Sequence, residues 1–228
     1  MLFITREEAN TLEHWESLCP GGLRFVYDDV HFRPGTDTFL LSSLPHLKPG
    51  ARVCDLGCGA GALLLLLLGR VSTLKVCAVE ISPIAADAAR RNLADNGLSG
   101  EIITGDLKDL ASLPQAGAWD LVVSNPPWFP DGSGRSGGPA RMEEQCTLEQ
   151  LCAAAARCLK NGGRFALVHR PDRLTDLLCA LRAAGLEPKR MQLVQHREDK
   201  APSAVLLEAV RQGRPGLEVL PVRTGPLN

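Results

Sequence analysis

Residues 52–61 read Arg-Val-Cys-Asp-Leu-Gly-Cys-Gly-Ala-Gly and decide the fold of this chain. Residues 52–56 have the apolar character of a buried strand, and residues 60–68 continue as an apolar helix. Glycines at the turn let a ligand approach the backbone closely, and the start of a helix offers free N–H groups to an anionic group. This succession predicts a strand, a turn and a helix that together bind a nucleotide-like cofactor.

The same alternation of strand and helix continues toward the C-terminus. Apolar runs separated by helical segments indicate a mostly parallel sheet that is covered on both faces. The last two strands are joined by a charged loop without a helix, so the final strand should run antiparallel near the edge of the sheet. We expect seven strands at 52–56, 75–80, 101–104, 119–124, 164–169, 191–195 and 204–210, and helices at 60–68, 83–96, 107–113, 147–159 and 173–184.

The N-terminal segment is too short for a core of its own. Its pattern predicts a helix over 6–18, a hairpin between 23–27 and 30–32, and a helix over 39–47 that Thr36 or Asp37 caps. We therefore divide the chain into an N-terminal flap (1–48), a main domain (49–222) and a tail (223–228).

Composition excludes several classes of protein. The chain has 228 residues, of which 45% are hydrophobic, enough to build one full core. No run approaches the roughly 18 apolar residues of a membrane span, and the N-terminus lacks a signal-peptide pattern, so a cytoplasmic protein is expected. The eight cysteines form no Cys-x-x-Cys pair, which predicts reduced core thiols and no metal site.

The net charge is only −1, but the charges are unevenly distributed. Residues 157–214 carry twelve Arg or Lys side chains against six acids, whereas residues 1–30 carry two against six. The C-terminal part could offer a positive face to phosphates, or its arginines could simply be solvated. The candidate phosphate contacts are Arg170, Arg173, Lys189, Arg190 and Arg197.

Acidic residues follow three of the predicted strands and indicate which cofactor binds. Glu80 closes the second strand, where a carboxylate can accept the hydroxyl groups of a ribose. Asp106 follows the third strand and can meet an adenine edge, while Asp55 precedes the glycines of the turn. An acid in the turn would repel a pyrophosphate but would accept from the amine of a methionine moiety. S-adenosylmethionine therefore fits better than NAD, with Asp55, Gly57, Gly59, Gly61, Glu80, Asp106 and Asn125 as binding residues; the alternative is a glycine turn without a ligand.

The strand at 119–124 ends in Asn125, Pro126, Pro127 and Trp128. Prolines restrict themselves and the preceding residue to extended conformations, so two acceptor groups are held in fixed directions beside a flat aromatic side chain. Such an edge suits a flat substrate that carries N–H groups; the alternative is a Pro-rich turn with Trp128 in the core. The Gly/Ser-rich loop 129–141 begins next to this edge and is interpreted as a lid, the alternative being slack without a role.

Together these motifs resemble the class I S-adenosylmethionine-dependent methyltransferases, which have a Rossmann-like fold, and in particular those with an Asn-Pro-Pro-aromatic motif. From about residue 22 to 222 the chain resembles the bacterial tRNA adenine-N6-methyltransferases that modify the adenine beside the anticodon of valine tRNA. The stretches that carry the resemblance are Asp55 to Gly61, Arg90-Arg91-Asn92, Asn96-Gly97-Leu98, Asn125-Pro126-Pro127, Leu167 to Leu174 and Ala204 to Val210.

This resemblance implies a catalytic role for residues 125–128. Asn125 Oδ1 and the Pro126 carbonyl would accept the two N–H groups of an exocyclic amine and aim its lone pair at the methyl group, while Trp128 stacks on a flipped base. The chain departs from the family at Trp128, where Tyr is usual, and in the arrangement of Arg24-Phe25 and Asp37-Thr38.

Two further hypotheses remain open at the level of sequence. An Asn-Pro-Pro turn also serves enzymes that methylate guanine N2 in rRNA or a glutamine amide in a protein. A different class of function is a scaffold that binds S-adenosylmethionine without catalysis.

Overall fold

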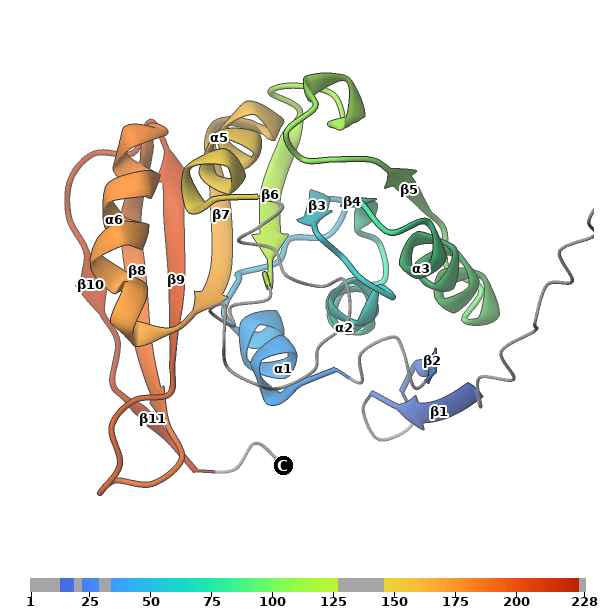
Figure 1. Cartoon of the computed structure of the whole chain (residues 1–228), viewed down its shortest axis with the longest axis horizontal. Coiled ribbons are helices and arrows are strands. Elements are labelled where there is room, and N and C mark those ends of the chain that lie inside the picture. Colours follow the sequence, from blue (N-terminus) through green and yellow to red (C-terminus); the bar gives the residue numbers. More distant parts are fainter. Residues whose placement is uncertain (1–12, 19–21, 29–33, 127–145, 226–228) are drawn as a thin grey trace, which may run out of the picture.

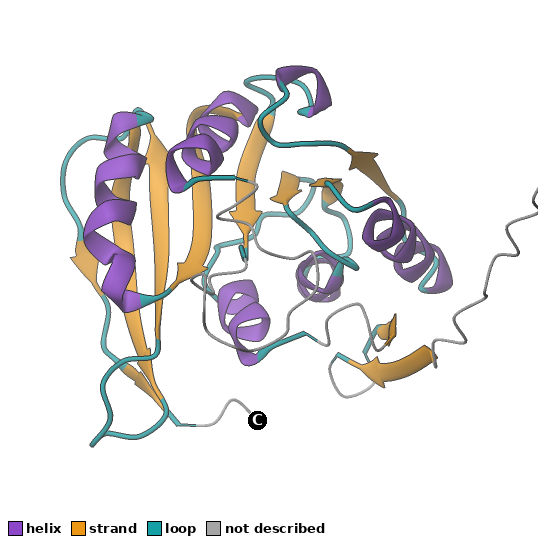
Figure 2. Cartoon of the chain, in the orientation of Figure 1, coloured by secondary structure: helices purple, strands orange, loops and turns teal. Residues whose placement is uncertain are grey.

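The strands predicted from residue 52 onward form the central sheet of the protein (Figures 1 and 2). The structure is a computed structural model, described for residues 13–18, 22–28, 34–126 and 146–225. In that sheet the order of the seven predicted strands is β5-β4-β3-β6-β7-β9-β8, and β10 and β11 add two short pairings to β8. The strand bounds are β3 Arg52–Leu56, β4 Lys75–Glu80, β5 Gly100–Thr104, β6 Trp119–Ser124, β7 Leu159–His169, β8 Leu186–Gln195, β9 Ala204–Arg211, β10 Glu218–Val219 and β11 Arg223–Thr224.

The direction of the last long strand confirms the prediction from the missing helix. β9 runs antiparallel to both β7 and β8, whereas β3, β4, β5, β6 and β7 pair with one another in parallel. The sheet is therefore mixed and Rossmann-like, with one antiparallel strand near its edge.

Helices cover both faces of the sheet and create two separate cores (Figure 1). One face packs against α1 (Thr36–Ser43), α2 (Ala62–Arg70) and α3 (Pro83–Asp95). The other packs against α5 (Leu148–Cys158) and α6 (Leu174–Ala183). Because successive strand residues alternate between the two cores, as Val53 and Cys54 do, the central strands are apolar at most consecutive positions.

The first helix predicted from sequence is wrong where the structure describes it. Residues Glu13–Ser17 form strand β1, which pairs antiparallel with β2 (Arg24–Asp28). The pairing with β2, which places Phe25 in the core, overrides the weak local helix pattern. Residues 6–12 and the predicted second hairpin strand, 30–32, lie outside the described residues.

Two other elements differ from their predicted bounds or caps. Helix α1 begins at Thr36 and ends at Ser43, and its N-cap is Gly35, so the predicted caps Thr36 and Asp37 lie inside its first turn. Pro45 lies two residues beyond Ser43, and a proline cannot donate a helical hydrogen bond. The predicted helix 107–113 is only a short 3-10 turn, η1 (Leu110–Ser112), whose cap Asp109 accepts from the Ala111 N–H at 2.9 Å. A second such turn, η2 (Pro171–Arg173), precedes α6.

Six of the eight cysteines are buried free thiols, whereas Cys179 on α6 is exposed and Cys19 is not described.

Within the described residues, the structure has no helix with the length and hydropathy needed to cross a membrane.

Candidate active site

The carboxyl ends of β3, β4 and β6 lie side by side and bring most of the predicted site residues together. The parallel register pairs Asp55 with Val123 and Leu56 with Val79, so Asp55, Glu80 and Asn125 sit at one edge of the sheet on neighbouring strands. Asp106 follows β5, one strand farther out. We call residues 55–61 with Glu80 and Asp106 the cofactor half, and residues 125–128 the acceptor half, after the roles predicted for them from the sequence.

The glycine turn of the cofactor half needs glycine for its backbone shape. Gly57, Gly59 and Gly61 have φ angles of 79°, 53° and 87°, in the left-handed region that side chains disfavour. A Cβ on Gly61 would also lie 3.2 Å from the Cβ of Ala89 in α3. Gly61 is the N-cap of α2 and supplies no side-chain cap, which leaves the first-turn N–H groups to another partner. The turn is thus a cradle of the kind that holds an anionic group.

Asp55 is a buried carboxylate that lacks a protein partner. Its side chain is 1% exposed, and among the described residues neither oxygen has a hydrogen bond. Burial and, second, the neighbouring Glu80 carboxylate raise the pKa of Asp55 to about 8. An unpaired buried carboxylate is costly unless a cation accompanies it. The ammonium group of a methionine moiety is such a cation, so this side chain fits S-adenosylmethionine.

Glu80 and Asp106 both shape the loops that carry them. Glu80 accepts from the Gly59 N–H through Oε2 and from the Ser82 N–H through Oε1, each at 2.9 Å. Asp106 accepts from the Lys108 N–H at 2.9 Å, and its other oxygen lies 3.5 Å from Lys108 Nζ. Each carboxylate oxygen keeps a further lone pair for a ligand hydroxyl or amine.

The acceptor half begins at the end of β6, where a side-chain hydrogen bond joins β6 to β3. Ser124 is fully buried and donates through Oγ to the Leu56 carbonyl at 2.7 Å. The next residue, Asn125, is half-buried and donates through Nδ2 to Thr38 Oγ1 at 3.0 Å. Pro126 is buried. Pro127, Trp128 and the predicted lid 129–141 lie outside the described residues.

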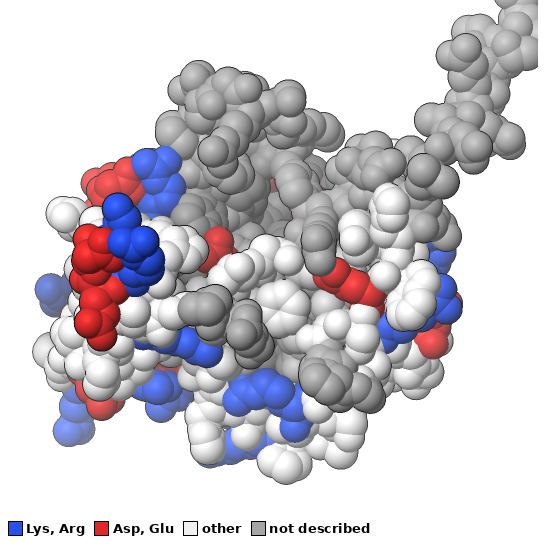
Figure 3. All heavy atoms as spheres, turned by 90° about the horizontal axis from the view of Figure 1, so that it is seen from below, with Lys and Arg blue, Asp and Glu red and all other residues white. Residues whose placement is uncertain are grey.

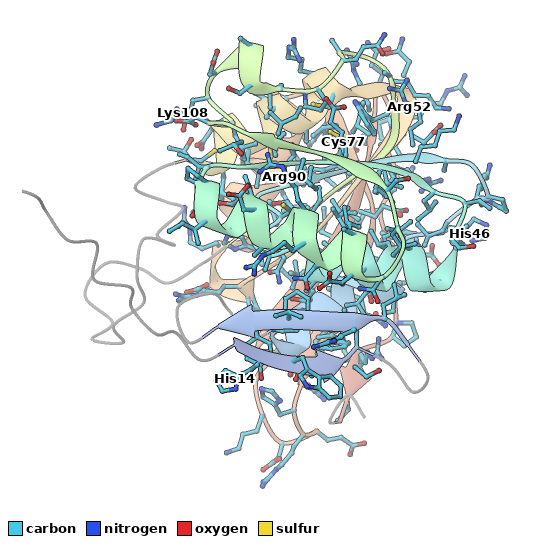
Figure 4. All side chains as sticks on the ribbon, turned by 90° about the vertical axis from the view of Figure 1, so that its right-hand side faces the viewer. His14, His46, Arg52, Cys77, Arg90 and Lys108 are labelled. Carbon is cyan, nitrogen blue, oxygen red and sulfur yellow. The ribbon has the colours of Figure 1, made fainter. Side chains whose placement is uncertain are left out.

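Two asparagines that sequence reasoning left without a role attach the N-terminal hairpin to α3. Asn92 is 1% exposed; its Oδ1 accepts from the Val26 N–H at 2.8 Å and its Nδ2 donates to the Val26 carbonyl at 2.9 Å. Asn96 makes the same pair of bonds with Arg24, at 2.8 and 2.7 Å. The free edge of β2 therefore pairs with two side-chain amides one helical turn apart, and Figure 4 shows the hairpin alongside α3. Both asparagines stand in stretches that carry the family resemblance, but nothing in the sequence indicates that β2 is their partner.

Asn92 also reaches the cofactor half. Its Nδ2 donates to the Ala60 carbonyl at 2.9 Å, inside the glycine turn. On the outer side of the same helix, Arg90 donates to the Ile102 carbonyl and to Thr104, and so binds α3 to β5 (Figure 4). The hairpin, α3 and the glycine turn are thus one connected unit.

Three of the five candidate phosphate contacts pair with carboxylates that are close in the sequence. Arg170 pairs with Asp172, Arg173 with Asp176 and Arg197 with Asp199. The other two candidates point to backbone carbonyls, Lys189 to that of Arg214 and Arg190 to that of Leu44. Figure 3 shows basic and acidic side chains next to one another at the end of the molecule where α6 and β8 lie.

Comparison with known families decides what kind of site this is. A family model described as "Methyltransferase small domain" matches residues 25–178, more than half of the chain. The chain belongs to this methyltransferase family. It is an S-adenosylmethionine-dependent methyltransferase, which is the enzyme class and the cofactor expected from the sequence.

The two relatives reported next are named as methyltransferases with different substrates. A tRNA1(Val) (adenine(37)-N6)-methyltransferase from Porphyromonas gingivalis is 36% identical over 190 residues, covering 77% of this methyltransferase and 73% of the relative. A release factor glutamine methyltransferase from Mycolicibacterium smegmatis is 37% identical over 152 residues, covering 60% of this chain and 52% of the relative.

Solved structures support the fold. A predicted O-methyltransferase from Agrobacterium tumefaciens aligns with a TM-score of 0.68 at 22% identity, covering 83% of this methyltransferase and 86% of the other chain.

Within the part of the chain that is described, no group of three or more His, Cys, Asp or Glu side chains is arranged to hold a metal ion.

Proposed function

We propose that this methyltransferase transfers a methyl group to the exocyclic N6 of an adenine in tRNA. The observation that carries the proposal is the position of Asn125 and Pro126, at the end of β6 and beside the cofactor half, in a chain 36% identical to a tRNA1(Val) (adenine(37)-N6)-methyltransferase. An exocyclic aromatic amine is a weak nucleophile because its lone pair is delocalised into the ring. Two fixed acceptors for its N–H groups favour a tetrahedral nitrogen, which localises the lone pair and directs it at the methyl group.

Each residue of the acceptor half has a proposed role. Asn125 Oδ1 and the Pro126 carbonyl accept the two N–H groups of the amine and orient it. Pro127 keeps this turn extended, and Trp128 stacks on the base, a contact worth about 1–3 kcal/mol. No strong base is needed before attack, since the amine N–H becomes acidic only as the new N–C bond replaces the methyl–sulfur bond of the donor, and its proton then passes to water.

The residues of the cofactor half bind the methyl donor. S-adenosylmethionine supplies an electrophilic methyl group on a sulfonium. We assign Asp55 to its ammonium group, the glycine turn with the start of α2 to its carboxylate, and Glu80 and Asp106 to its ribose and adenine. The orphaned carboxylate of Asp55 and the uncapped start of α2 support the first two assignments.

The proposed division of the chain keeps residues 49–222 as the catalytic domain and 1–48 as a flap, with 223–228 as a tail. The attachment of β2 to α3 and of Asn125 to α1 supports a flap that contributes to the site. A tRNA substrate implies a cytoplasmic enzyme.

Methylation of a glutamine amide is the second candidate. It is favoured by the 37% identity to a release factor glutamine methyltransferase, although this chain spans about half of that protein. An amide side chain, like adenine N6, offers a planar NH₂ group to Asn125 and Pro126.

Labelled methyl transfer to matched acceptors distinguishes the two candidates. Purified enzyme is incubated with unmodified tRNA, with ribosomal RNA and with a release factor, and the Asn125→Ala variant serves as the control. We expect label in tRNA that digests to N6-methyladenosine. Label in the release factor or in a guanine of rRNA, with none in tRNA, would replace the proposal by that alternative.

A further inference from the structure

The side-chain amide of Asn125 is held by a residue far away in the sequence. Asn125 Nδ2 donates to Thr38 Oγ1 at 3.0 Å across a separation of 87 residues. Thr38 lies in the first turn of α1 and is 7% exposed. Within the described part of the chain, no hydrogen bond is made to Asn125 Oδ1. The oxygen end of the amide is therefore the end left for a substrate.

The two ends of an amide are not equivalent for this reaction. An amine to be methylated offers only N–H donors, so it needs Asn125 Oδ1 and cannot use Nδ2. When Oδ1 faces the amine, Nδ2 points the other way and requires an acceptor of its own. A threonine hydroxyl can accept or donate, and here it supplies that acceptor.

Helix α1 is anchored firmly enough for Thr38 to act in this way. Three arginines from separate elements contact its C-terminal end: Arg70 of α2, Arg190 of β8 and Arg223 of β11. Arg70 donates to the Pro45 carbonyl at 3.1 Å and also to that of Ser42, and Arg190 donates to the Leu44 carbonyl at 3.2 Å. Cations at the C-terminus of a helix are favourable, and these cations also join α1 to α2 and to the sheet.

We propose that Thr38 is a positioning residue of the methyl-transfer step, which keeps Asn125 Oδ1 turned toward the acceptor amine by accepting from Nδ2. This inference rests on the proposed function of Asn125 as an amine acceptor. It gives the flap a defined part in the site, because α1 belongs to residues 1–48.

Thr38→Val and Thr38→Ser test the proposal as a matched pair. Valine keeps the shape of threonine but leaves Nδ2 without an acceptor, and the loss of the bond that orients the Asn125 amide should lower kcat about 10- to 100-fold. Serine keeps the hydroxyl and should stay within about threefold of the wild type. For both variants we expect the Kd for S-adenosylmethionine and the KM for the acceptor to change less than about twofold, because only the orientation of Asn125 changes.

Ser42→Ala is the control for a purely structural effect. It removes another buried hydroxyl from α1, one that donates to the Phe39 carbonyl at 2.7 Å. We expect it to lower the midpoint of thermal unfolding as much as Thr38→Val does, yet to leave kcat unchanged. An unchanged kcat in Thr38→Val, or equal losses in Thr38→Val and Thr38→Ser, would overturn the proposal.

A spectroscopic measurement separates this inference from the proposed function. The side-chain NH₂ signals of Asn125, identified by their absence from Asn125→Asp, should shift in the NMR spectrum of Thr38→Val and stay in place in Thr38→Ser. This readout needs no methyl acceptor. Unmoved signals in Thr38→Val overturn the inference even if tRNA is methylated, whereas shifted signals together with methylation of a glutamine leave the inference standing and overturn only the choice of tRNA.

Discussion

The cofactor half and the acceptor half of the site are built in different ways. The cofactor half comes from one contiguous turn and the ends of adjacent strands, and backbone bonds such as Gly57 N–H to the Val79 carbonyl, at 2.8 Å, fix its shape. The acceptor half depends on side chains from distant segments, above all the bond between Asn125 and Thr38. The first half is thus set by local sequence, whereas the second is assembled by the tertiary fold. Substitutions should separate the two halves cleanly.

The largest effect is expected at Asn125. Asn125→Ala removes an acceptor for the reacting amine and should lower kcat at least about 100-fold, the usual cost of losing one oriented group. Asn125 was also predicted among the residues that bind S-adenosylmethionine, but its proposed contact is with the acceptor amine, so calorimetry should find the Kd for the donor within about twofold of the wild type. Loss of donor binding in this variant would show that the two halves are not separate.

Asp55→Asn should damage the opposite half. Loss of a charge-assisted bond to the donor's ammonium group should weaken the Kd for S-adenosylmethionine by about 30- to 100-fold. The cofactor-free protein should become more stable at pH 8, since a buried unpaired carboxylate is removed. Thermal unfolding and calorimetry measure both effects, with Asp106→Asn as the control because Asp106 already has Lys108 as a partner. Equal effects at both positions would contradict the assignment of Asp55.

The raised pKa of Asp55 predicts a pH dependence of donor binding. The pKa of Asp55 is about 8 in the folded protein, against an ordinary value of 3.8. Between pH 3.8 and 8 the folded protein therefore keeps a proton on Asp55 that the unfolded chain has lost. The stability of the cofactor-free protein should therefore fall as pH rises through this window, while affinity for a cation rises. We expect the Kd for S-adenosylmethionine to improve by up to about tenfold per pH unit between pH 6 and 8, with release of a proton.

Calorimetry in two buffers of different ionisation enthalpy measures how many protons are released when the donor binds. In Asp55→Asn the dependence of the Kd on pH should disappear. A wild-type affinity that does not change between pH 6 and 8 would mean that Asp55 is already ionised or does not contact the ammonium group.

The smallest effects are expected where the hairpin joins the cofactor half. Asn92→Ala removes two bonds to Val26 and one to Ala60 in the glycine turn. It should lower the free energy of unfolding by about 2–3 kcal/mol and weaken S-adenosylmethionine binding severalfold. Asn96→Ala removes only bonds at the exposed end of the hairpin and within α3, so its cost should be about 1 kcal/mol with the Kd unchanged. Equal losses of donor affinity in the two variants would break the proposed link between Asn92 and the turn.

This difference between the halves also explains what the sequence could predict. Asp55, the glycines and Glu80 could be placed together because the carboxyl ends of parallel strands share one edge, and strands with two buried faces are easy to recognise. The antiparallel direction of β9 followed from a missing helix.

Long-range pairings left no such signal. The residues of β1 were predicted as a helix, because the pairing with β2 that makes them a strand leaves no pattern in the local sequence. Gly35 caps α1 in place of the expected residues, because the helix begins before its first apolar residue. Asn92 and Thr38 have partners 66 and 87 residues away, Val26 and Asn125, and neither has a local motif. The ion pair between Arg170 and Asp172 is different, because the two residues are close in the sequence and the pair could have been expected from their spacing. A count of net charge does not reveal such pairs.

Nucleoside analysis of tRNA tests the central claim most directly. Total tRNA is purified from cells with the gene, from cells lacking it, and from deletion cells that express the wild type or Asn125→Ala, and N6-methyladenosine is quantified by mass spectrometry. We predict that the N6-methyladenosine of tRNA falls in the deletion strain, returns with the wild type and does not return with Asn125→Ala. An unchanged level of N6-methyladenosine in the deletion strain would contradict the account.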